Sequence, residues 1–154
     1  MKRALLSILF VAACGKGGSS DKPAPAKPPT GAPVAVEGTI SGKDSVDVDV
    51  YNFADKPTAL YDFMFRYHDK DGKVMKVKAG TPFESTIDRM SMSGRHFMCD
   101  PAHWCHFKVD MLNPPDGAKT VDALVDRVGS TDGTKIDDLW KLESTGGMDE
   151  WPVK

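Results

Sequence analysis

The sequence lacks a strong charge of one sign, a long apolar run and the common catalytic motifs. Its 20 basic and 22 acidic residues leave a formal net charge of −2, and the acidic residues are scattered along the chain. This balance argues against nucleic acid as a partner. The sequence contains no Gly-x-Ser-x-Gly elbow, no phosphate-binding glycine loop and no zinc-protease helix motif, so we expect no enzyme.

The one apolar segment of note lies at the N-terminus and is short. Lys2 and Arg3 precede residues 4–13. At about 1.5 Å per residue, this segment covers only about half of a roughly 30 Å hydrocarbon core, which is typical of a signal peptide and not of a membrane-spanning helix. It ends in Val11-Ala12-Ala13-Cys14, which resembles the lipobox of bacterial lipoproteins.

The lipobox resemblance implies a role for Cys14. It implies that residues 1–13 form a signal peptide, that cleavage falls before Cys14 and that the thiol of Cys14 receives a diacylglycerol, with an acyl chain added to the new amino group. Two or more fatty chains hold a protein stably on a membrane. In the enteric sorting rule for this family, an aspartate after the cysteine retains the protein in the inner membrane. Gly15 at that position implies the periplasmic face of the outer membrane.

Residues 14–33 predict a disordered linker behind the lipidated cysteine. Residues 15–33 hold four glycines, five prolines and no aromatic residue among nineteen positions. We expect the glycine-rich start to be flexible and the proline-rich part to approach an extended polyproline II conformation. At about 3 Å per residue, the full reach of this spacer is about 50 to 60 Å.

The remaining residues, 34–154, have a length suited to one domain, and their alternation predicts strands. Residues 45–51 place valines on one face and aspartates on the other. Residues 59–68 carry four aromatic side chains on one face, as a central core strand would. We therefore expect an all-β fold, a small antiparallel immunoglobulin-like β-sandwich. The four aromatic residues are Tyr61, Phe63, Phe65 and Tyr67.

A short stretch of this domain resembles a known module. Leu60-Tyr61-Asp62, together with Asn52-Phe53, is similar to the small immunoglobulin-like modules of bacterial envelope lipoproteins that are named for a Phe-x-Leu-Tyr-Asp motif. Thr58 stands where that motif has its phenylalanine. The resemblance covers about thirty residues, implies a β-sandwich and carries over no functional residue.

Two segments leave a helix open. The apolar residues between 121 and 128 fit helical spacing as well as they fit strand alternation. The turn dipeptides Asp116-Gly117 and Asp132-Gly133 on either side favour a strand, whereas a helix near 118–128 would make the fold α+β. Residues 81–84 have the form of a capping box with proline at the first helical position, which allows a short helix there.

Residues 90–111 are the one candidate site, because they hold two of the three cysteines, three of the four histidines and four of the eight methionines. With Cys14 taken by lipid, Cys99 and Cys105 remain as an even pair outside the cytoplasm, where a disulfide is the default. If residues 95–99 and 104–111 form an antiparallel hairpin, these cysteines lie opposite each other, with Cα atoms about 4.5 to 5.5 Å apart. That separation fits a disulfide.

The same hairpin register predicts which other residues face each other. It places Phe97 opposite Phe107 on the cysteine face and Met98 opposite His106 on the outer face. His96 would then lie diagonally from His106. The set His96, Met98 and His106, together with the nearby Met90 and Met92, is the kind of nitrogen and sulfur ligand set that copper prefers, although such residues are also typical of a solvated sheet face and of core gaps.

Three functions follow from these observations. The first is a non-catalytic envelope lipoprotein, anchored to the membrane through Cys14, whose sandwich binds or supports a protein or polysaccharide partner. The second is a copper-binding lipoprotein that uses the face of His96, Met98 and His106. The third and weakest is a small hydrolase. We expect no cofactor for the first, and no nucleic-acid partner for any of them.

Overall fold

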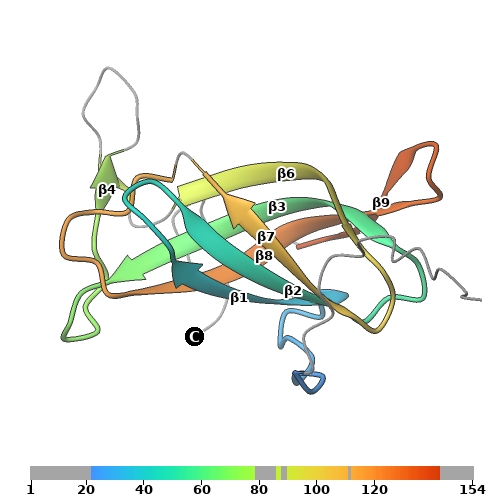
Figure 1. Cartoon of the computed structure of the whole chain (residues 1–154), viewed down its shortest axis with the longest axis horizontal. Coiled ribbons are helices and arrows are strands. Elements are labelled where there is room, and N and C mark those ends of the chain that lie inside the picture. The colour runs from blue at the N-terminus through green and yellow to red at the C-terminus, as the bar shows by residue number, and fades with distance from the viewer. Residues whose placement is uncertain (1–21, 79–85, 88–89, 111, 143–154) are drawn as a thin grey trace, which may run out of the picture.

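The structure is a computed structural model that describes residues 22–78, 86–87, 90–110 and 112–142. That part of the chain contains nine strands and no helix. The strands form a three-stranded sheet in the order β1-β2-β7, a four-stranded sheet in the order β6-β3-β8-β9, and a small β4-β5 pair (Figure 1). The bounds are β1 Val34–Ile40, β2 Val46–Asn52, β3 Thr58–His68, β4 Val77–Lys78, β5 Thr86–Ile87, β6 Met90–Cys99, β7 Trp104–Val109, β8 Thr120–Thr131 and β9 Ile136–Lys141.

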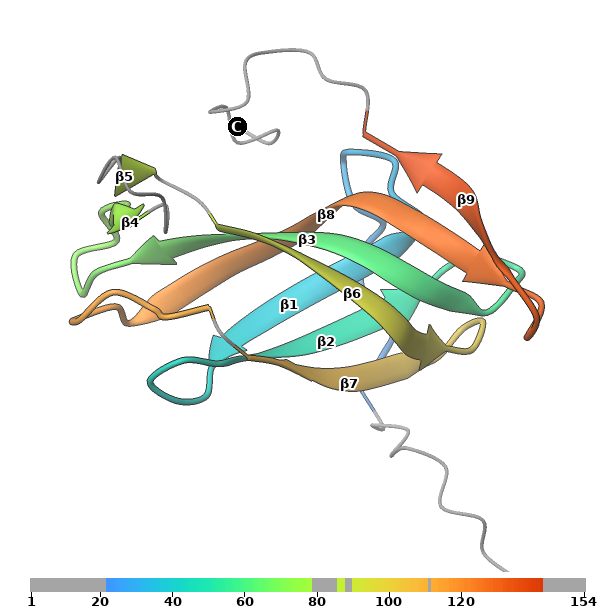
Figure 2. The same ribbon diagram turned by 90° about the horizontal axis from the view of Figure 1, so that it is seen from above.

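The two larger sheets pack face to face as a β-sandwich (Figure 2). All strand pairs are antiparallel. The chain crosses between the two sheets after β2, after β6 and after β7. Crossing connections of this kind are typical of immunoglobulin-like sandwiches. The predicted all-β sandwich is therefore confirmed.

The alternative helix near 118–128 is wrong, because these residues belong largely to strand β8. The helical spacing has a physical cause in a β-bulge. Phe63 of β3 pairs with Val125, and Asp62 pairs with Arg127, so Asp126 is an extra residue on β8. A bulge of this kind resets the alternation, and Val125 and Val128, three residues apart, both face the core.

The core lies between the valines of β2 and the aromatic residues of β3, as the alternation predicted. Tyr61, Phe63, Phe65 and Tyr67 are fully buried, and so are Val46, Val48 and Val50. The outer face of β3 departs from the expected polar pattern, because Leu60 and Met64 are buried as well. Central strands of a sheet commonly bury residues on both faces.

The region after β3 is described only in part. His68 forms a single bridge with Val74 after a turn over residues 69–73, and β4 then pairs with β5 through Val77 and Ile87. Residues 81–84, which the sequence allowed as a helix start, lie outside the described residues. No helix in the described residues is long and apolar enough to cross a membrane.

Part of the predicted linker contacts the sandwich. The backbone amide of Phe53 donates a 2.8 Å hydrogen bond to the carbonyl of Pro33, and Ala32 is 5% exposed within the core cluster. The side chain of Lys22 and the carbonyl of Pro23 also reach β7. The folded unit therefore begins at least eleven residues before Val34, where the sequence placed the start of the domain.

Candidate functional site

Cys14, the predicted lipidation site, lies outside the described residues. The structure therefore bears on the rest of the chain, starting at Lys22. The linker residues 15–21 also lie outside the description. Membrane attachment through Cys14 stays a prediction from the sequence.

Cys99 and Cys105 form a disulfide, as predicted, with an S–S distance of 2.09 Å and a Cα–Cα distance of 5.6 Å. The predicted hairpin around it is wrong. Cys99 ends β6, which pairs with β3, whereas Cys105 lies in β7 and pairs with Val50 of β2. The disulfide therefore joins the two sheets of the sandwich and does not bridge neighbouring strands of one sheet.

Phe97 and Phe107 still meet, although they are not a cross-strand pair. Their rings stack with centroids 4.9 Å apart and planes inclined by 13°. Phe97 belongs to β6 and Phe107 to β7, so the contact crosses the interior of the sandwich. The facing of these rings was predicted correctly for the wrong reason, since both the hairpin and the sandwich bring the cysteine faces of the two strands together.

The shared outer face proposed for copper does not form. His96 and Met98 lie on β6 in one sheet, and His106 lies on β7 in the other, so the predicted Met98 and His106 pair is wrong. His96 has a φ of 65° in an irregular stretch between the pairs Arg95–Leu60 and Cys99–Thr58. The side chains of Met90 and Met92 lie outside the described residues. In the described part, no group of three or more His, Cys, Asp or Glu residues could hold a metal ion.

The described cysteines, together with Tyr61 and Tyr67, contribute to the core. Both described cysteines are in the disulfide, so neither offers a thiolate nucleophile. Burial raises the pKa of Tyr67 to about 12, and its hydroxyl has no hydrogen-bond partner among the described residues. Burial also raises the pKa of Tyr61, whose hydroxyl lies 2.8 Å from the hydroxyl of Thr58. Both phenols stay protonated at neutral pH.

The outer face of the β1-β2-β7 sheet carries ordered rows of side chains, because residues that pair across three strands share one face. One row consists of Glu37, Asp49 and His106, and the next consists of Ala35, Tyr51 and Trp104. His106 donates from Nδ1 to Asp49 Oδ1 at 2.8 Å. Of the residues in these two rows, only His106 was a candidate site residue in the sequence.

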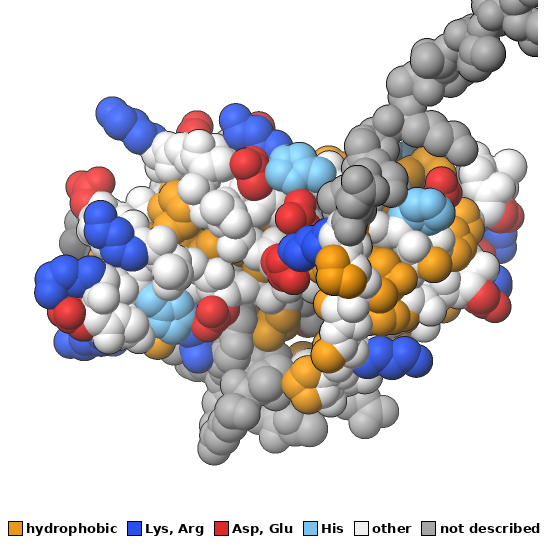
Figure 3. All heavy atoms as spheres, turned by 60° about the horizontal axis from the view of Figure 1, so that its bottom comes forward, with side chains coloured by type: hydrophobic (Ala, Val, Ile, Leu, Met, Phe, Trp, Pro, Cys, Tyr) orange, Lys and Arg blue, Asp and Glu red, His pale blue; other side chains and the backbone are white. Residues whose placement is uncertain are grey.

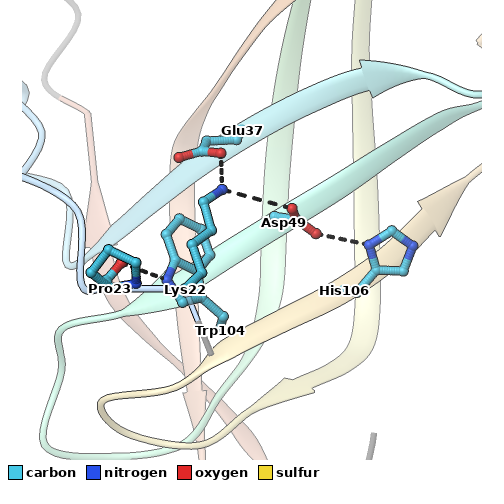
Figure 4. A network of polar contacts seen from close by, with 6 residues as sticks. All are labelled: Lys22, Pro23, Glu37, Asp49, Trp104 and His106. Atoms are coloured by element: carbon cyan, nitrogen blue, oxygen red, sulfur yellow. Dashed lines mark hydrogen bonds and ion pairs between the residues drawn. The ribbon is translucent and has the colours of Figure 1, made fainter. Parts of the chain in front are cut away.

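The linker lies on this face through Lys22 and Pro23 (Figure 4). Lys22 Nζ pairs with Glu37, lies 3.9 Å from Asp49 Oδ2 and stands 4.2 Å from the centre of the Trp104 ring. The indole N–H of Trp104 donates a 3.0 Å hydrogen bond to the carbonyl of Pro23. A cation thus lies between two carboxylates and over an aromatic ring.

A groove of about 590 Å³ lies beside this contact, between the linker, β1 and β8. Its floor is formed where β1 approaches β8 closely, since a Cβ on Gly38 would lie only 3.0 Å from the Cβ of Ala123. The lining is more apolar than polar, and it includes the acidic residues Glu37 and Asp122. The groove is lined by residues 25–30, 32, 34–38 and 121–125.

The rest of the described surface mixes both charges. Figure 3 shows acidic and basic side chains interspersed on the face that it presents. On the outer face of the second sheet, Asp62 accepts a 2.5 Å hydrogen bond from Ser93, and Arg127 bonds to Asp138. The hydrogen bonds and charge of Asp138 raise the pKa of Arg127.

No protein-family model, curated protein or solved structure matches this chain.

The docked linker and the groove were not predicted from the sequence. Two signals for the docking were present. The dipeptides Lys22-Pro23 and Lys27-Pro28 repeat five residues apart, and Asp47 and Asp49 alternate on the outer face of β2. A basic proline-rich segment next to an acidic strand face is a candidate for an intramolecular contact.

Proposed function

We propose that the protein is a membrane-anchored envelope lipoprotein whose non-catalytic β-sandwich binds or supports a protein or polysaccharide partner. The observation that carries the proposal is the order of parts along the chain: a lipobox-type sequence ending at Cys14, a proline-rich spacer and a disulfide-bridged sandwich. A structural disulfide suits a compartment outside the cytoplasm. Gly15 after the cysteine supports the periplasmic face of the outer membrane.

The groove between the linker, β1 and β8 supports a binding role. Its volume of about 590 Å³ lies within the range of roughly 300 to 1,000 Å³ that is usual for ligand sites. Its lining is more apolar than polar and offers packing, and it includes Glu37 and Asp122, whose carboxylates pair with Lys22 and His68. We place the partner there.

The anchor is tested by replacing Cys14. The wild-type chain should fractionate with membranes, and its N-terminal peptide should carry a diacylglycerol mass. Cys14→Ala should release the protein into the soluble fraction with the Cys99–Cys105 disulfide intact, because the disulfide lies far along the chain from the signal. Gly15→Asp is the matched variant, and it should keep the anchor and move the protein to the inner membrane. A Cys14→Ala protein that stays on membranes would overturn the anchor.

The binding role is tested by placing a photo-reactive side chain at one of two leucine positions in the full-length protein in its native envelope. Leu124 lines the groove, whereas Leu139 is exposed on β9 outside it. Crosslinking from position 124 should yield one reproducible adduct with an envelope protein or polysaccharide. Position 139 should yield none of it. Equal adducts from both positions, or none from position 124, would contradict a partner in the groove.

A further inference from the structure

The acidic row on the β1-β2-β7 sheet takes its lysine from the linker. The row consists of Glu37, Asp49 and His106, and it holds no lysine or arginine of its own. Lys22, which precedes β1 by twelve residues, ion-pairs with both carboxylates of the row. Two carboxylates side by side repel each other, and a cation between them relieves that repulsion.

An aromatic row next to the acidic row receives the same linker. Trp104, Tyr51 and Phe53 form a continuous cluster, with ring centroids 5.4 Å apart for Tyr51 and Trp104 and 4.8 Å apart for Tyr51 and Phe53. Lys22 stands over the Trp104 ring, and Lys27 stands 6.0 Å from the centre of the Phe53 ring. The two lysines of the Lys-Pro repeat therefore reach the two ends of one aromatic cluster.

The hydrogen bond to Pro23 matches a known way of recognising proline-rich chains. Proline-rich segments adopt polyproline II, which leaves the backbone carbonyls without internal partners, and aromatic grooves bind such segments. Here the indole N–H of Trp104 donates to the free carbonyl of Pro23 at 3.0 Å. Because proline fixes φ, such a segment loses little conformational entropy when it binds.

We propose that this face is a binding site for extended lysine- and proline-rich peptide, and that residues 22–29 of the same chain are its resident ligand. Trp104 recognises the backbone, Glu37 and Asp49 recognise the lysine ahead of the first proline, and Tyr51 and Phe53 support the aromatic surface. The site adjoins the groove proposed for the partner, because Glu37 belongs to both and residues 25–30 of the linker form one wall of that groove.

The docked linker has a consequence for the position of the sandwich, and this consequence rests on the proposed anchor at Cys14. Docking at Lys22 leaves residues 15–21 between the anchor and the sandwich. Seven residues span at most about 25 Å, compared with about 50 to 60 Å for the whole linker. Docking thereby brings the outer face of β1-β2-β7 towards the membrane.

The docking itself is tested on the soluble chain that starts at Gly15, without lipid. Lys22→Glu places a third carboxylate between Glu37 and Asp49. It should shift the Trp104 indole N–H resonance and lower the backbone order parameter of Ala24 from about 0.85 to below about 0.6. Lys43→Glu, which makes the same charge change in the turn between β1 and β2, at the opposite end of β2 from the Tyr51–Trp104 pair, should leave the Trp104 resonance in place. If Lys22→Glu leaves it in place too, or if both variants shift it equally, the docking is overturned.

Binding of a separate peptide is tested on the Lys22→Glu chain, in which the resident ligand is released. The peptide Lys-Pro-Ala-Pro-Ala-Lys-Pro-Pro, added at millimolar concentration, should return the Trp104 indole N–H to its wild-type position. The same peptide with glutamate in place of its first lysine should not. No shift with the first peptide, or equal shifts with both, would overturn the site. The readout does not involve the membrane, so its failure is distinguishable from failure of the anchor at Cys14.

Discussion

The carboxylates on the outer faces of the two sheets are neutralised in different ways. On β6-β3-β8-β9, Ser93, Asp62 and Arg127 form a row across three strands, and Arg127 also ion-pairs with Asp138 of β9, so this cation and its acids all belong to the sheet. On β1-β2-β7, the acidic row is completed by Lys22 from outside the sheet. The charge of Arg127 is therefore balanced within its own sheet, whereas the row of Glu37, Asp49 and His106 is open to a cationic segment.

The difference matters for binding more than for stability. Exposed ion pairs contribute about 0 to 1 kcal/mol each, because water and salt screen them. Neither row therefore holds the sandwich together. The open row can nevertheless select a ligand by charge, and its neighbour Trp104 adds a directional hydrogen bond. The stability of the two sheets is decided in the core and at the disulfide.

The core contribution of the two sheets is compared by truncating one side chain in each. Phe63→Ala should destabilise the fold by about 3 to 5 kcal/mol, because a fully buried ring is lost from between Tyr61 and Phe65. Val48→Ala, at a fully buried site in the other sheet, should cost about 2 kcal/mol, since two carbon groups are lost. Urea unfolding followed by tryptophan fluorescence measures both. Equal losses would show that the aromatic strand does not dominate the core.

Loss of the disulfide between the sheets should have the next largest effect on the free energy of unfolding. Replacing Cys99 and Cys105 together by alanine should lower the free energy of unfolding by about 2 kcal/mol, which is the chain-entropy value for so short a loop. The stacked Phe97 and Phe107 rings keep the two strands in contact without it. Reducing the wild-type protein before urea unfolding should produce a similar loss. An unchanged unfolding midpoint on reduction would show that the disulfide adds nothing.

Local pattern predicted the strands but could not assign them to sheets. The alternation of residues 45–51 and 59–68 determines which side chains face inward, and it correctly predicted both core faces. The sheet that β6 and β7 join depends on long-range pairing. The Cα separation of 5.6 Å between Cys99 and Cys105 suits a bridge between sheets as well as one within a hairpin, so the cysteines did not discriminate.

The surface that receives the linker could not be predicted from the sequence, for a related reason. The composition of residues 22–33 shows that they cannot build a core of their own, but it does not show which part of the sandwich they contact. Trp104 carries no local sign that its indole N–H faces Pro23, because the two residues are 81 positions apart. The predicted shared face of His96, Met98 and His106 is wrong for the same reason, since it required His96 and His106 to lie in one sheet.

Adding a methyl group at one crowded glycine in each sheet should give a smaller difference in stability. A Cβ on Gly129 of β8 would lie 2.7 Å from Leu60 Cβ and 2.9 Å from Ile136 Cγ2, so Gly129→Ala should cost about 1 to 2 kcal/mol through overpacking. Gly38 of β1 is less crowded, with Ala123 Cβ at 3.0 Å. Gly38→Ala should therefore cost less, on the order of 0.5 to 1 kcal/mol. Thermal unfolding of both variants compares them, and the reverse order would contradict the packing described for the two sheets.

The hairpin turns of the two sheets should give the smallest difference in stability, and that difference should depend on pH. The β1-β2 turn is closed by a backbone hydrogen bond between Ser41 and Ser45, whereas the β8-β9 turn depends on a carboxylate. Asp132 Oδ1 accepts hydrogen bonds from the hydroxyl and amide of Thr134 and from the amide of Lys135, and these bonds lower its pKa from 3.8 to about 2.

A lowered pKa has a defined consequence for stability. Because the carboxylate is favoured in the folded state, the contribution of Asp132 is fully present above its unfolded pKa of about 3.8 and is lost as the pH falls through about 2. Carboxyl carbon shifts followed by NMR from pH 5 to pH 1.5 should show Asp132 titrating near 2. Thr134→Ala removes the hydroxyl donor and should raise that midpoint towards 3.8, with no change in the shifts around Ser41 and Ser45. A wild-type midpoint near 3.8 would mean that the carboxylate of Asp132 does not hold the β8-β9 turn.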